Sequence, residues 1–465
     1  MEEKDREKDR NEEIEEKKER RAFRRRRRVR NQIIAYVVAV LLLAGIVAAA
    51  DFGIQQFMIY ARAWQENREA NINPDPVPEE SPDVFVADDD PIVDDPTPID
   101  DNPPPDDPPP VDPLPVPSAL DIFVEDRIAE LGPEEKIAAL FVITPEALTG
   151  ASPVVRAGDT TRERLEEYPV GGLAYFAANI SSATQISEML ENTKEMSKYP
   201  IFLAVDEEGG SVARLARANL AENVGPMADI GESGDPDAAK AAGLTIGTYL
   251  GEYGFNLNFA PVADVLADDE NSIIGDRSFG SDATLVGQMV AAFVSGQKEA
   301  GVFSTLKHFP GLGNTDIDTH DGMAVSEQTL DDLRAVDLLP FIAGIEAGAE
   351  LVMVGHISLP AIIGDNTPAS LSVQIINDLL RGELGYTGIV ITDALNMGAI
   401  TEYYAPDEAV IKAIEAGADM LLMPENFAEA YEGLLTALNS GQISMERIDE
   451  SLRRIYRIKY AERVE

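Results

Sequence analysis

Two histidines, a lysine and three aspartates occur together in one short stretch, residues 307–321. The whole chain has three histidines, so this stretch is the first candidate for acid–base chemistry. Within it, Asp318 and His320 are two residues apart, and in an extended loop such side chains point the same way. The carboxylate can then hold the imidazole by a hydrogen bond, fix its tautomer and raise its basicity. A proton shuttle that works near neutral pH needs this arrangement.

Two other uses of the same residues remain open. The pair Asp318 and His320 can be purely structural, or His308 can join it in a metal site. The chain lacks the His-x-x-x-His and Glu-x-x-His spacings that are typical of metal ligands on a helix. We therefore expect neither a metal nor another cofactor.

A single aspartate, Asp393, stands at the end of the β-branched run 389–392. A carboxylate at a strand end can attack the anomeric carbon of a sugar and form a covalent glycosyl intermediate. The alternative for such an aspartate is the N-cap of a following helix.

Two further segments carry charged side chains suited to binding a sugar. Asp206 opens the glycine-containing segment 206–214, where a carboxylate can accept two sugar hydroxyls and glycine lets the backbone approach a ligand. Arg277 lies in the turn-rich loop 275–280, and a guanidinium fork recognises hydroxyl and acyl oxygens. The alternatives are a helix N-cap for Asp206 and a surface ion pair with Asp276 for Arg277.

The elements that must position these residues are short apolar, β-prone runs separated by helix-like stretches such as 238–253, 284–300 and 373–384. Alternating strands and helices predict a parallel sheet, and eight units predict an α/β fold of the (β/α)8 TIM-barrel type. A doubly wound open sheet is the second choice, but no glycine-rich dinucleotide fingerprint supports it. The eight runs are 139–143, 171–176, 201–205, 256–260, 302–306, 351–355, 388–391 and 420–423.

Polar or charged residues follow these runs again and again. In a barrel the carboxyl ends of all strands meet on one face, which holds the active site. Residues far apart in the sequence are therefore expected around one pocket. They are Asp206, Glu207, Asp264, Lys307, His308, His356 and Asp393.

The composition of residues 1–118 predicts a membrane-anchored protein. Residues 1–32 carry an arginine run, and the uncharged apolar stretch 33–50 is 18 residues long, near the length of a membrane span. Arginines before a span keep that end in the cytoplasm, so a single-pass anchor at 33–60 would place the remainder outside the cell. A cleaved signal peptide ending near residue 50 is the competing interpretation, but the apolar stretch is longer than a usual signal-peptide core.

Residues 61–118 have the composition of a linker. Between residues 71 and 118 there are 16 prolines and 14 acidic residues, with no lysine or arginine. A proline-rich segment whose charges all have the same sign is extended and semi-rigid. The segment is a stalk or a passive spacer, and residues 119–465 form the single catalytic domain.

Overall composition excludes several function classes. The formal net charge of −45 argues against DNA or RNA as a partner, because phosphate binding needs a basic surface. The chain has no cysteine, which excludes disulfides, thiolate metal sites, a cysteine nucleophile and a lipoprotein anchor.

Five segments in a fixed order carry a resemblance that covers roughly residues 121–460. They are Asp-Glu-Glu-Gly-Gly-x-Val-x-Arg at 206–214, Arg-Ser-Phe-Gly at 277–280, Lys-His-Phe-Pro-Gly at 307–311, Pro-Ala-Ser-Leu-Ser at 368–372 and Ile-Thr-Asp-Ala-Leu-x-Met at 391–397. Together they resemble glycoside hydrolase family 3, in its β-N-acetylhexosaminidase (NagZ-like) branch.

The resemblance implies a retaining hydrolase of terminal β-linked N-acetylglucosamine (GlcNAc) that needs no cofactor. Asp393 matches the nucleophile, and His320 matches a histidine acid/base whose dyad partner is Asp318. Five further residues match positions that hold the sugar, namely Asp206, Arg214, Arg277, Lys307 and His308.

This chain departs from the family pattern in two places. Leu312 and Asn314 stand where the family commonly has a histidine and an aspartate, so the family's loop motion and aglycone contacts are not carried over to this chain. Ala394 stands where a second acid is frequent, so Asp393 is the sole acid of its motif. We expect no second α/β domain after the barrel.

From these observations we expect an outward-facing exo-β-N-acetylglucosaminidase at a bacterial cell membrane. Its substrate would be a GlcNAc-containing glycan, such as a peptidoglycan fragment or muropeptide. Alternatives are a β-N-acetylglucosaminide phosphorylase, another family 3 β-glycosidase, and an inactive cell-wall-binding protein. Phosphorolysis is open because a histidine acid/base tolerates an anionic phosphate better than a carboxylate does.

Overall fold

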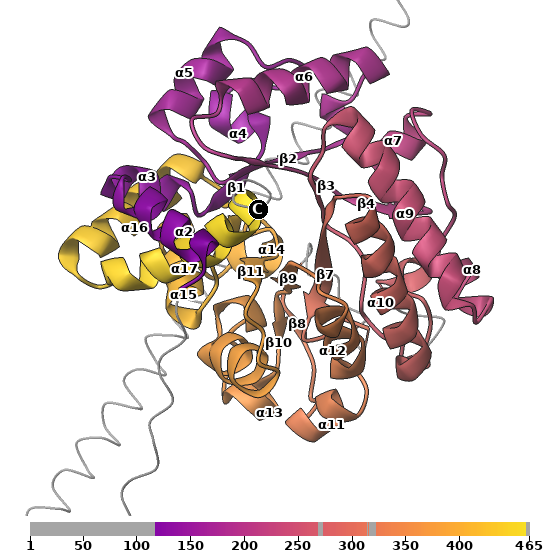
Figure 1. Cartoon of the computed structure of the whole chain (residues 1–465). Helices are drawn as coiled ribbons and strands as arrows, with labels where there is room; N and C mark the ends of the chain where they lie inside the picture. Colours follow the sequence, from indigo (N-terminus) through magenta and orange to yellow (C-terminus); the bar gives the residue numbers. More distant parts are fainter. Residues whose placement is uncertain (1–116, 268–272, 314, 316–321, 462–465) are drawn as a thin grey trace, which may run out of the picture. The chain divides into compact units, whose positions relative to one another are not determined.

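The structure is a computed structural model that describes residues 117–267, 273–313, 315 and 322–461 (Figure 1). The expected tail and membrane anchor, nearly all of the expected linker, and the predicted acid–base pair Asp318–His320 lie outside these residues. No helix within them has both the length and the apolar composition of a membrane span.

Eight parallel strands form the central sheet, and each overlaps one of the eight predicted runs. They are β1 (Phe141–Ile143), β2 (Gly172–Tyr175), β3 (Phe202–Val205), β6 (Leu257–Asn258), β7 (Phe303–Phe309), β9 (Leu351–Val354), β11 (Ile389–Thr392) and β12 (Leu421–Leu422).

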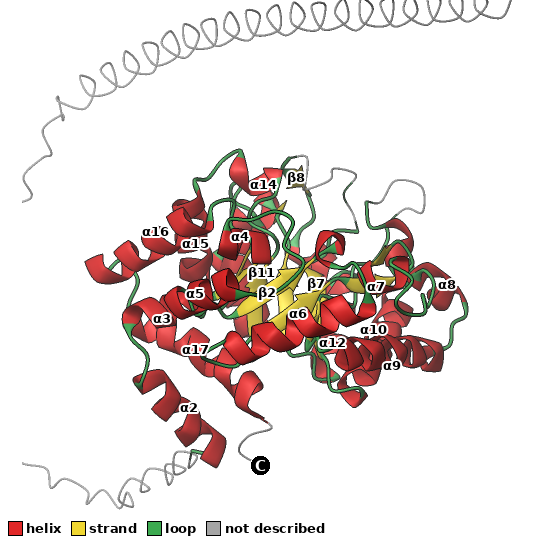
Figure 2. Cartoon of the chain, turned by 90° about the horizontal axis from the view of Figure 1, so that it is seen from above, coloured by secondary structure: helices red, strands yellow, loops and turns green. Residues whose placement is uncertain are grey.

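The sheet curls until its two ends meet. Its strand order is β11-β9-β7-β6-β3-β2-β1-β12, with every neighbouring pair parallel. At the seam, Ile391 of β11 forms a parallel bridge with Met420, and Thr392 N donates to Met420 O at 3.1 Å. Figure 2 shows the strands in the middle with helices around them. The fold is an α/β fold with a nearly closed barrel-like sheet, consistent with the predicted (β/α)8 barrel.

Helices connect the strands, and the three helical stretches singled out in the sequence are confirmed as α9, α10 and the π-helical segment η4. The α-helices are α2 (Ala119–Ala129), α3 (Pro133–Ala138), α4 (Pro145–Thr149), α5 (Asp159–Glu167), α6 (Ala183–Met196), α7 (Arg214–Arg217), α8 (Met227–Glu232), α9 (Pro236–Tyr253), α10 (Ala283–Glu299), α11 (Leu330–Ala335), α12 (Leu338–Glu346), α13 (Pro360–Ile363), α14 (Gly398–Thr401), α15 (Pro406–Ala416), α16 (Phe427–Ser440) and α17 (Met445–Tyr460).

Short elements complete the fold. The 3-10 turns are η1 (Ala177–Asn179), η2 (Gly275–Arg277) and η3 (Ala369–Leu371), and the π-helical segment is η4 (Gln374–Glu383). Two small sheets lie outside the barrel sheet: an antiparallel pair of β4 (Glu207–Gly209) and β5 (Val212–Ala213), and a parallel pair of β8 (Ala324–Val325) and β10 (Ile357–Ser358).

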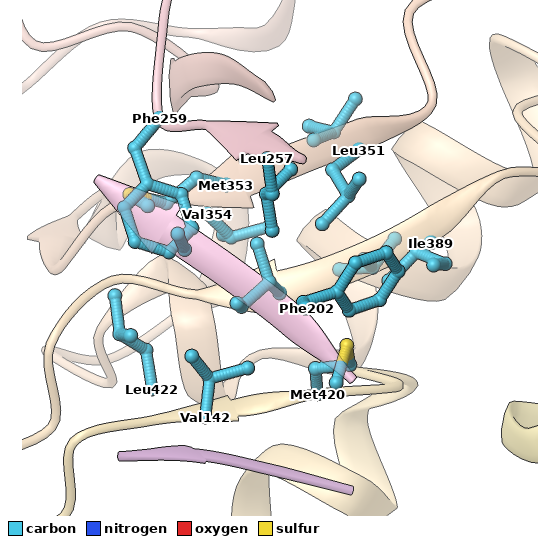
Figure 3. Packing of buried hydrophobic residues seen from close by; sticks show 14 of the residues in the cluster. Val142, Phe202, Leu257, Phe259, Leu351, Met353, Val354, Ile389, Met420 and Leu422 are labelled. Carbon is cyan, nitrogen blue, oxygen red and sulfur yellow. The ribbon is translucent and has the colours of Figure 1, made fainter. Parts of the chain in front are cut away.

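Apolar side chains fill the interior of the sheet. Figure 3 shows side chains from β1, β3, β6, β9, β11 and β12 pointing toward one another, among them Val142, Phe202 and Ile389. These three side chains are fully buried. A fully buried aliphatic or aromatic side chain stabilises a fold by about 1.5–3 kcal/mol, so this packing holds the strand ends in a fixed relation.

The first and last described helices pack on each other (Figure 1). Phe123 of α2 meets Tyr460 of α17 edge to face, with ring centroids 5.2 Å apart. Arg457 of α17 pairs with Asp121 of α2 at 2.8 Å. Asp121 also completes the capping box with Ser118 at the start of α2. This contact ties the start of the folded region to its last helix.

Asp419 is a buried anchor at the amino-terminal ends of β11 and β12. Its carboxylate accepts hydrogen bonds from Val390 N at 2.9 Å and from Ser451 Oγ at 2.9 Å. It also pairs with the guanidinium groups of Arg381 and Arg454, at 2.5 Å and 2.9 Å. These bonds join the strands to η4 and α17.

Asp419→Ala should lower the free energy of unfolding by about 3 kcal/mol, because it leaves the partly buried guanidinium groups of Arg381 and Arg454 without their buried carboxylate. Activity per folded molecule should not change, since Asp419 lies at the end of the strands opposite to the candidate site described below. Urea unfolding monitored by circular dichroism measures the first effect, and turnover below the unfolding transition measures the second. A stable variant with impaired turnover would contradict this separation of roles.

Candidate active site

The charged residues that the sequence placed after the strands do meet at the carboxyl-terminal ends of the barrel strands. Asp206 follows β3, Lys307 and His308 lie near the end of β7, and Asp393 follows β11. In the sheet order these strands lie in one continuous arc, β11-β9-β7-β6-β3. The peptide bonds before His308 and before Pro310 are cis.

An ion cluster joins Asp206, Glu208, Arg277 and Lys307. Lys307 Nζ lies 2.7 Å from Asp206 Oδ1 and 2.5 Å from Glu208 Oε1. Arg277 holds Glu208 with two hydrogen bonds, Nε to Oε2 at 2.7 Å and Nη2 to Oε1 at 2.8 Å. Arg214 lies at the edge, with Nη2 3.7 Å from Asp206 Oδ2. Four of the predicted sugar-binding residues are therefore joined in one network, in which Glu208 links Arg277 to Lys307.

Burial and charge act in opposite directions on this cluster. Burial alone would raise the pKa of Glu208, but the cations of Lys307 and Arg277 hold it at about 2. Burial likewise opposes the charge of Lys307, while Asp206 and Glu208 raise its pKa above the ordinary value. Glu208 and Lys307 are therefore ionised at neutral pH. Asp206 remains about 20% exposed at its side chain and can reach a ligand, whereas Glu208 is buried and holds its neighbours.

The acid next to Glu208 points elsewhere. Glu207 accepts hydrogen bonds from Leu215 N and Ala216 N, at 2.9 Å and 3.0 Å, so it caps the first turn of α7. Asn258 of β6 fixes its backbone, donating to Glu207 O and accepting from Glu207 N. The helix-cap alternative considered for this segment thus applies to Glu207, while Asp206 belongs to the ion cluster.

His308 is held by a buried carboxyl group from another strand end. Asp264 Oδ2 lies 2.7 Å from His308 Nδ1, and the same group accepts from Leu312 N at 2.7 Å and from His308 N. A carboxylate only accepts, so Nδ1 carries the proton of this bond and Nε2 is on the opposite side of the ring. Sequence reasoning had noted Asp264 at a strand end without giving it a role.

Asp393 is partly exposed and tied to its own loop. Its backbone N donates to Val354 O at 2.9 Å, and Ala394 N donates to its Oδ1 at 2.7 Å. Burial alone would raise the pKa of Asp393, but the neighbouring imidazoles of His308 and His356, with Lys307, hold it below the ordinary value. The carboxylate is therefore charged at neutral pH. It is not the cap of α14, whose N-cap is Met397.

The structure thus brings together six of the eight predicted site residues, and the other two, Asp318 and His320, lie outside the described residues. Glu208 is an additional residue of the site that the sequence did not single out, whereas Asp264 and His356 were expected around the pocket without a stated role. A period-two pattern could have found Glu208, because it stands two residues from Asp206 in an extended segment. In the described ranges no three His, Asp or Glu side chains form a group suited to a metal ion; the expectation of metal-free chemistry stays a prediction.

Comparison with known proteins gives consistent matches. The sequence model described as "Glycosyl hydrolase family 3 N terminal domain" matches residues 132–458. The chain is 36% identical over 327 residues to "Beta-hexosaminidase A" of Pseudoalteromonas piscicida, covering 64% of this chain and 54% of the relative. It is 33% identical over 344 residues to "Beta-hexosaminidase LpqI" of Mycobacterium tuberculosis, covering 71% of this chain and 84% of that one.

A solved structure shares the fold as well. It is a glycoside hydrolase family 3 β-N-acetylglucosaminidase from Paenibacillus sp. str. FPU-7, with a TM-score of 0.66 and 36% identity. The similarity covers 72% of this chain and 63% of that one. The chain therefore spans about half the length of the Pseudoalteromonas relative and somewhat less than two thirds of the Paenibacillus chain.

Proposed function

The chain belongs to glycosyl hydrolase family 3, and on that premise we propose that it is a retaining exo-β-N-acetylglucosaminidase. The observation that carries the proposal is the charged Asp393 carboxylate at the end of β11, beside a cluster of ionised groups at neighbouring strand ends. The β-hexosaminidase names of its relatives support the sugar.

In the proposed reaction Asp393 is the nucleophile and His320 is the acid/base. Asp393 attacks the anomeric carbon, the glycosidic C–O bond breaks, and the leaving oxygen takes a proton from His320. Water then loses a proton to His320 and attacks the same carbon, which releases the Asp393 carboxylate. Retaining glycosidases proceed by these two displacements. The roles of His320 and of its partner Asp318 are those of the family positions that these two residues match.

The binding residues have separate tasks. Asp206 accepts hydrogen bonds from sugar hydroxyls, and Lys307 donates to a sugar oxygen. His308, whose Nδ1 proton is bound by Asp264, presents Nε2 as an acceptor to a sugar hydroxyl. Arg214 and Arg277 supply guanidinium donors toward the acetamido and hydroxyl groups. Because Lys307 is already held by two carboxylates, its position is fixed before the substrate enters.

Turnover of an aryl β-N-acetylglucosaminide tests this proposal, with the matching β-glucoside as the control sugar. We expect preference for the N-acetylglucosaminide and unchanged rates on adding phosphate. Faster turnover with release of sugar 1-phosphate would favour the phosphorylase alternative, and preference for the β-glucoside would favour another family 3 glycosidase. A folded chain without turnover would support the inactive cell-wall-binding alternative.

We also propose that residues 33–60 anchor the enzyme in a bacterial membrane, with the linker 61–118 and the catalytic domain outside the cell. The uncharged stretch and the preceding arginines support this topology. The start of α2 at Ala119, directly after its capping residue Ser118, supports the boundary between linker and domain.

Because the chain has no cysteine, a single introduced cysteine can report on which side of the membrane its position lies. A membrane-impermeant maleimide added to intact cells should label Ser81→Cys in the linker but not Asn11→Cys in the tail. Labelling of both after cell lysis is the control for reactivity. Labelled Ser81→Cys protein in the medium, lacking the tail, would indicate cleavage instead of anchoring.

A further inference from the structure

His356 lies just after β9, fully buried, beside β11, the strand that precedes Asp393. Its Nε2 is 3.0 Å from the carbonyl oxygen of Ala394, and its Nδ1 is 2.7 Å from the hydroxyl oxygen of Ser370. A carbonyl oxygen only accepts, so Nε2 carries the proton of the first bond. In the neutral imidazole the Ser370 hydroxyl then donates to Nδ1, which fixes this tautomer.

Ser370 is the buried centre of the Pro-Ala-Ser-Leu-Ser segment at 368–372. This segment folds back onto the chain that follows β9: Ser370 N donates to Gly355 O at 3.1 Å, and Pro368 is bridged to Ser358. The turn itself is closed by Leu371 N donating to Pro368 O. The motif thereby places the Ser370 hydroxyl against His356. The reaction proposed above gives neither of these side chains a role.

The peptide groups on both sides of Ala394 are tied down. On one side, Ala394 N donates to Asp393 Oδ1 at 2.7 Å. On the other, Ala394 O accepts from His356 Nε2 and from Met397 N, and Leu395 N donates to Leu422 O at 2.9 Å. The backbone that orients the Asp393 carboxylate is therefore fixed from β12 and, through His356, from the segment containing Ser370.

We propose that His356 and Ser370 are positioning residues for Asp393. The relay from Ser370 through His356 to the Ala394 carbonyl holds the loop so that Asp393 Oδ1 stays bound to Ala394 N and Oδ2 faces the anomeric carbon. This inference rests on the proposed function. Both ring nitrogens of His356 are used within the relay, and the sugar contacts are assigned to other side chains. Losing the relay should therefore lower kcat and leave KM nearly unchanged.

Three variants test the relay, and a fourth is a matched control. His356→Ala removes the donor and should lower kcat about 10²-fold, the effect of a misplacement near 1 Å. His356→Gln can still donate from its amide to Ala394 O and should stay within about 10-fold of wild type. Ser370→Ala removes only the hydroxyl and should lower kcat about 10-fold. Ser451→Ala removes a buried hydroxyl bonded to Asp419 and should leave kcat unchanged.

The outcomes separate the relay from plain structural support. Equal loss in His356→Gln and His356→Ala, a loss confined to KM, or wild-type kcat in Ser370→Ala would each overturn the proposal. So would a kcat deficit that the unfolded fraction, measured by thermal unfolding, fully explains. If His356→Ala does not fold, the kcat of Ser370→Ala compared with that of Ser451→Ala tests the proposal. A folded wild-type chain that cleaves no aryl β-N-acetylglucosaminide would instead refute the proposed function.

Discussion

Replacing Asp393 by asparagine should lower kcat for an aryl β-N-acetylglucosaminide by about 10⁴-fold or more, the scale on which loss of a covalent nucleophile is measured. An amide does not displace the leaving group, so the first chemical step is lost. The structure makes the change nearly isosteric, because the amide oxygen of the new side chain could still accept from Ala394 N. The loss should therefore appear in kcat, with the fold and the ion cluster intact.

Mass spectrometry provides the direct measurement. A slowly released fluorinated substrate should add one sugar to the wild-type chain, at Asp393, and none to the Asp393→Asn variant. The control is Asp331→Asn, since the Asp331 side chain is 91% exposed on α11 and should react like wild type. Near-normal turnover by Asp393→Asn, or an adduct on another residue, would refute this nucleophile.

The barrel-like sheet was predictable because its signal is local. Each strand is buried on both faces, so it reads as a short apolar run with a polar residue at its end. All eight runs became strands of one sheet in the described part of the chain. The closure of the sheet was not visible in this way. It depends on β11 meeting β12 at Ile391 and Met420, a pairing that no spacing in the sequence encodes.

The site was predictable as a set of residues but not as a set of contacts. In an extended segment every second side chain points the same way, so contacts within one segment can be inferred from the sequence. Asp206 and Glu208 do point the same way, since both contact Lys307. An interaction between strands cannot be inferred in this way, and this explains why the pairing of Asp264 with His308 was missed. These residues are 44 positions apart, and a strand-end aspartate gives no indication of which neighbouring strand its partner occupies.

Glu208→Gln should have the second largest effect, on stability and on activity together. Glu208 is the only carboxylate bound to both Lys307 and Arg277 in the described part of the chain. Its neutral replacement leaves the buried Lys307 and the partly exposed Arg277 with less charge compensation, and breaking a buried ion pair in this way costs about 3 kcal/mol. Because Lys307 and Arg277 then shift relative to Asp206, kcat/KM should fall about 10²-fold.

The stability effect should depend on pH in a direction fixed by the pKa of Glu208. That pKa is about 2 in the folded chain and 4.5 ordinarily, a difference worth about 3 kcal/mol. A lowered carboxyl pKa stabilises the fold above pH 4.5, and this contribution is lost as the pH falls toward 2. The unfolding free energy of wild type minus that of Glu208→Gln should therefore be constant above about pH 5.5 and shrink on acidification.

Glu350→Gln is a control with the opposite sign. Burial raises the pKa of Glu350, even though it accepts a hydrogen bond from Ser304 N. Acidification therefore relieves the cost of its charge in the folded chain, and the unfolding free energy of wild type minus that of Glu350→Gln should rise instead of falling. Urea unfolding at pH values from about 6 to about 3 measures both series. A Glu208→Gln deficit that does not shrink over this range would show that Glu208 supports the site by its shape and not by its charge.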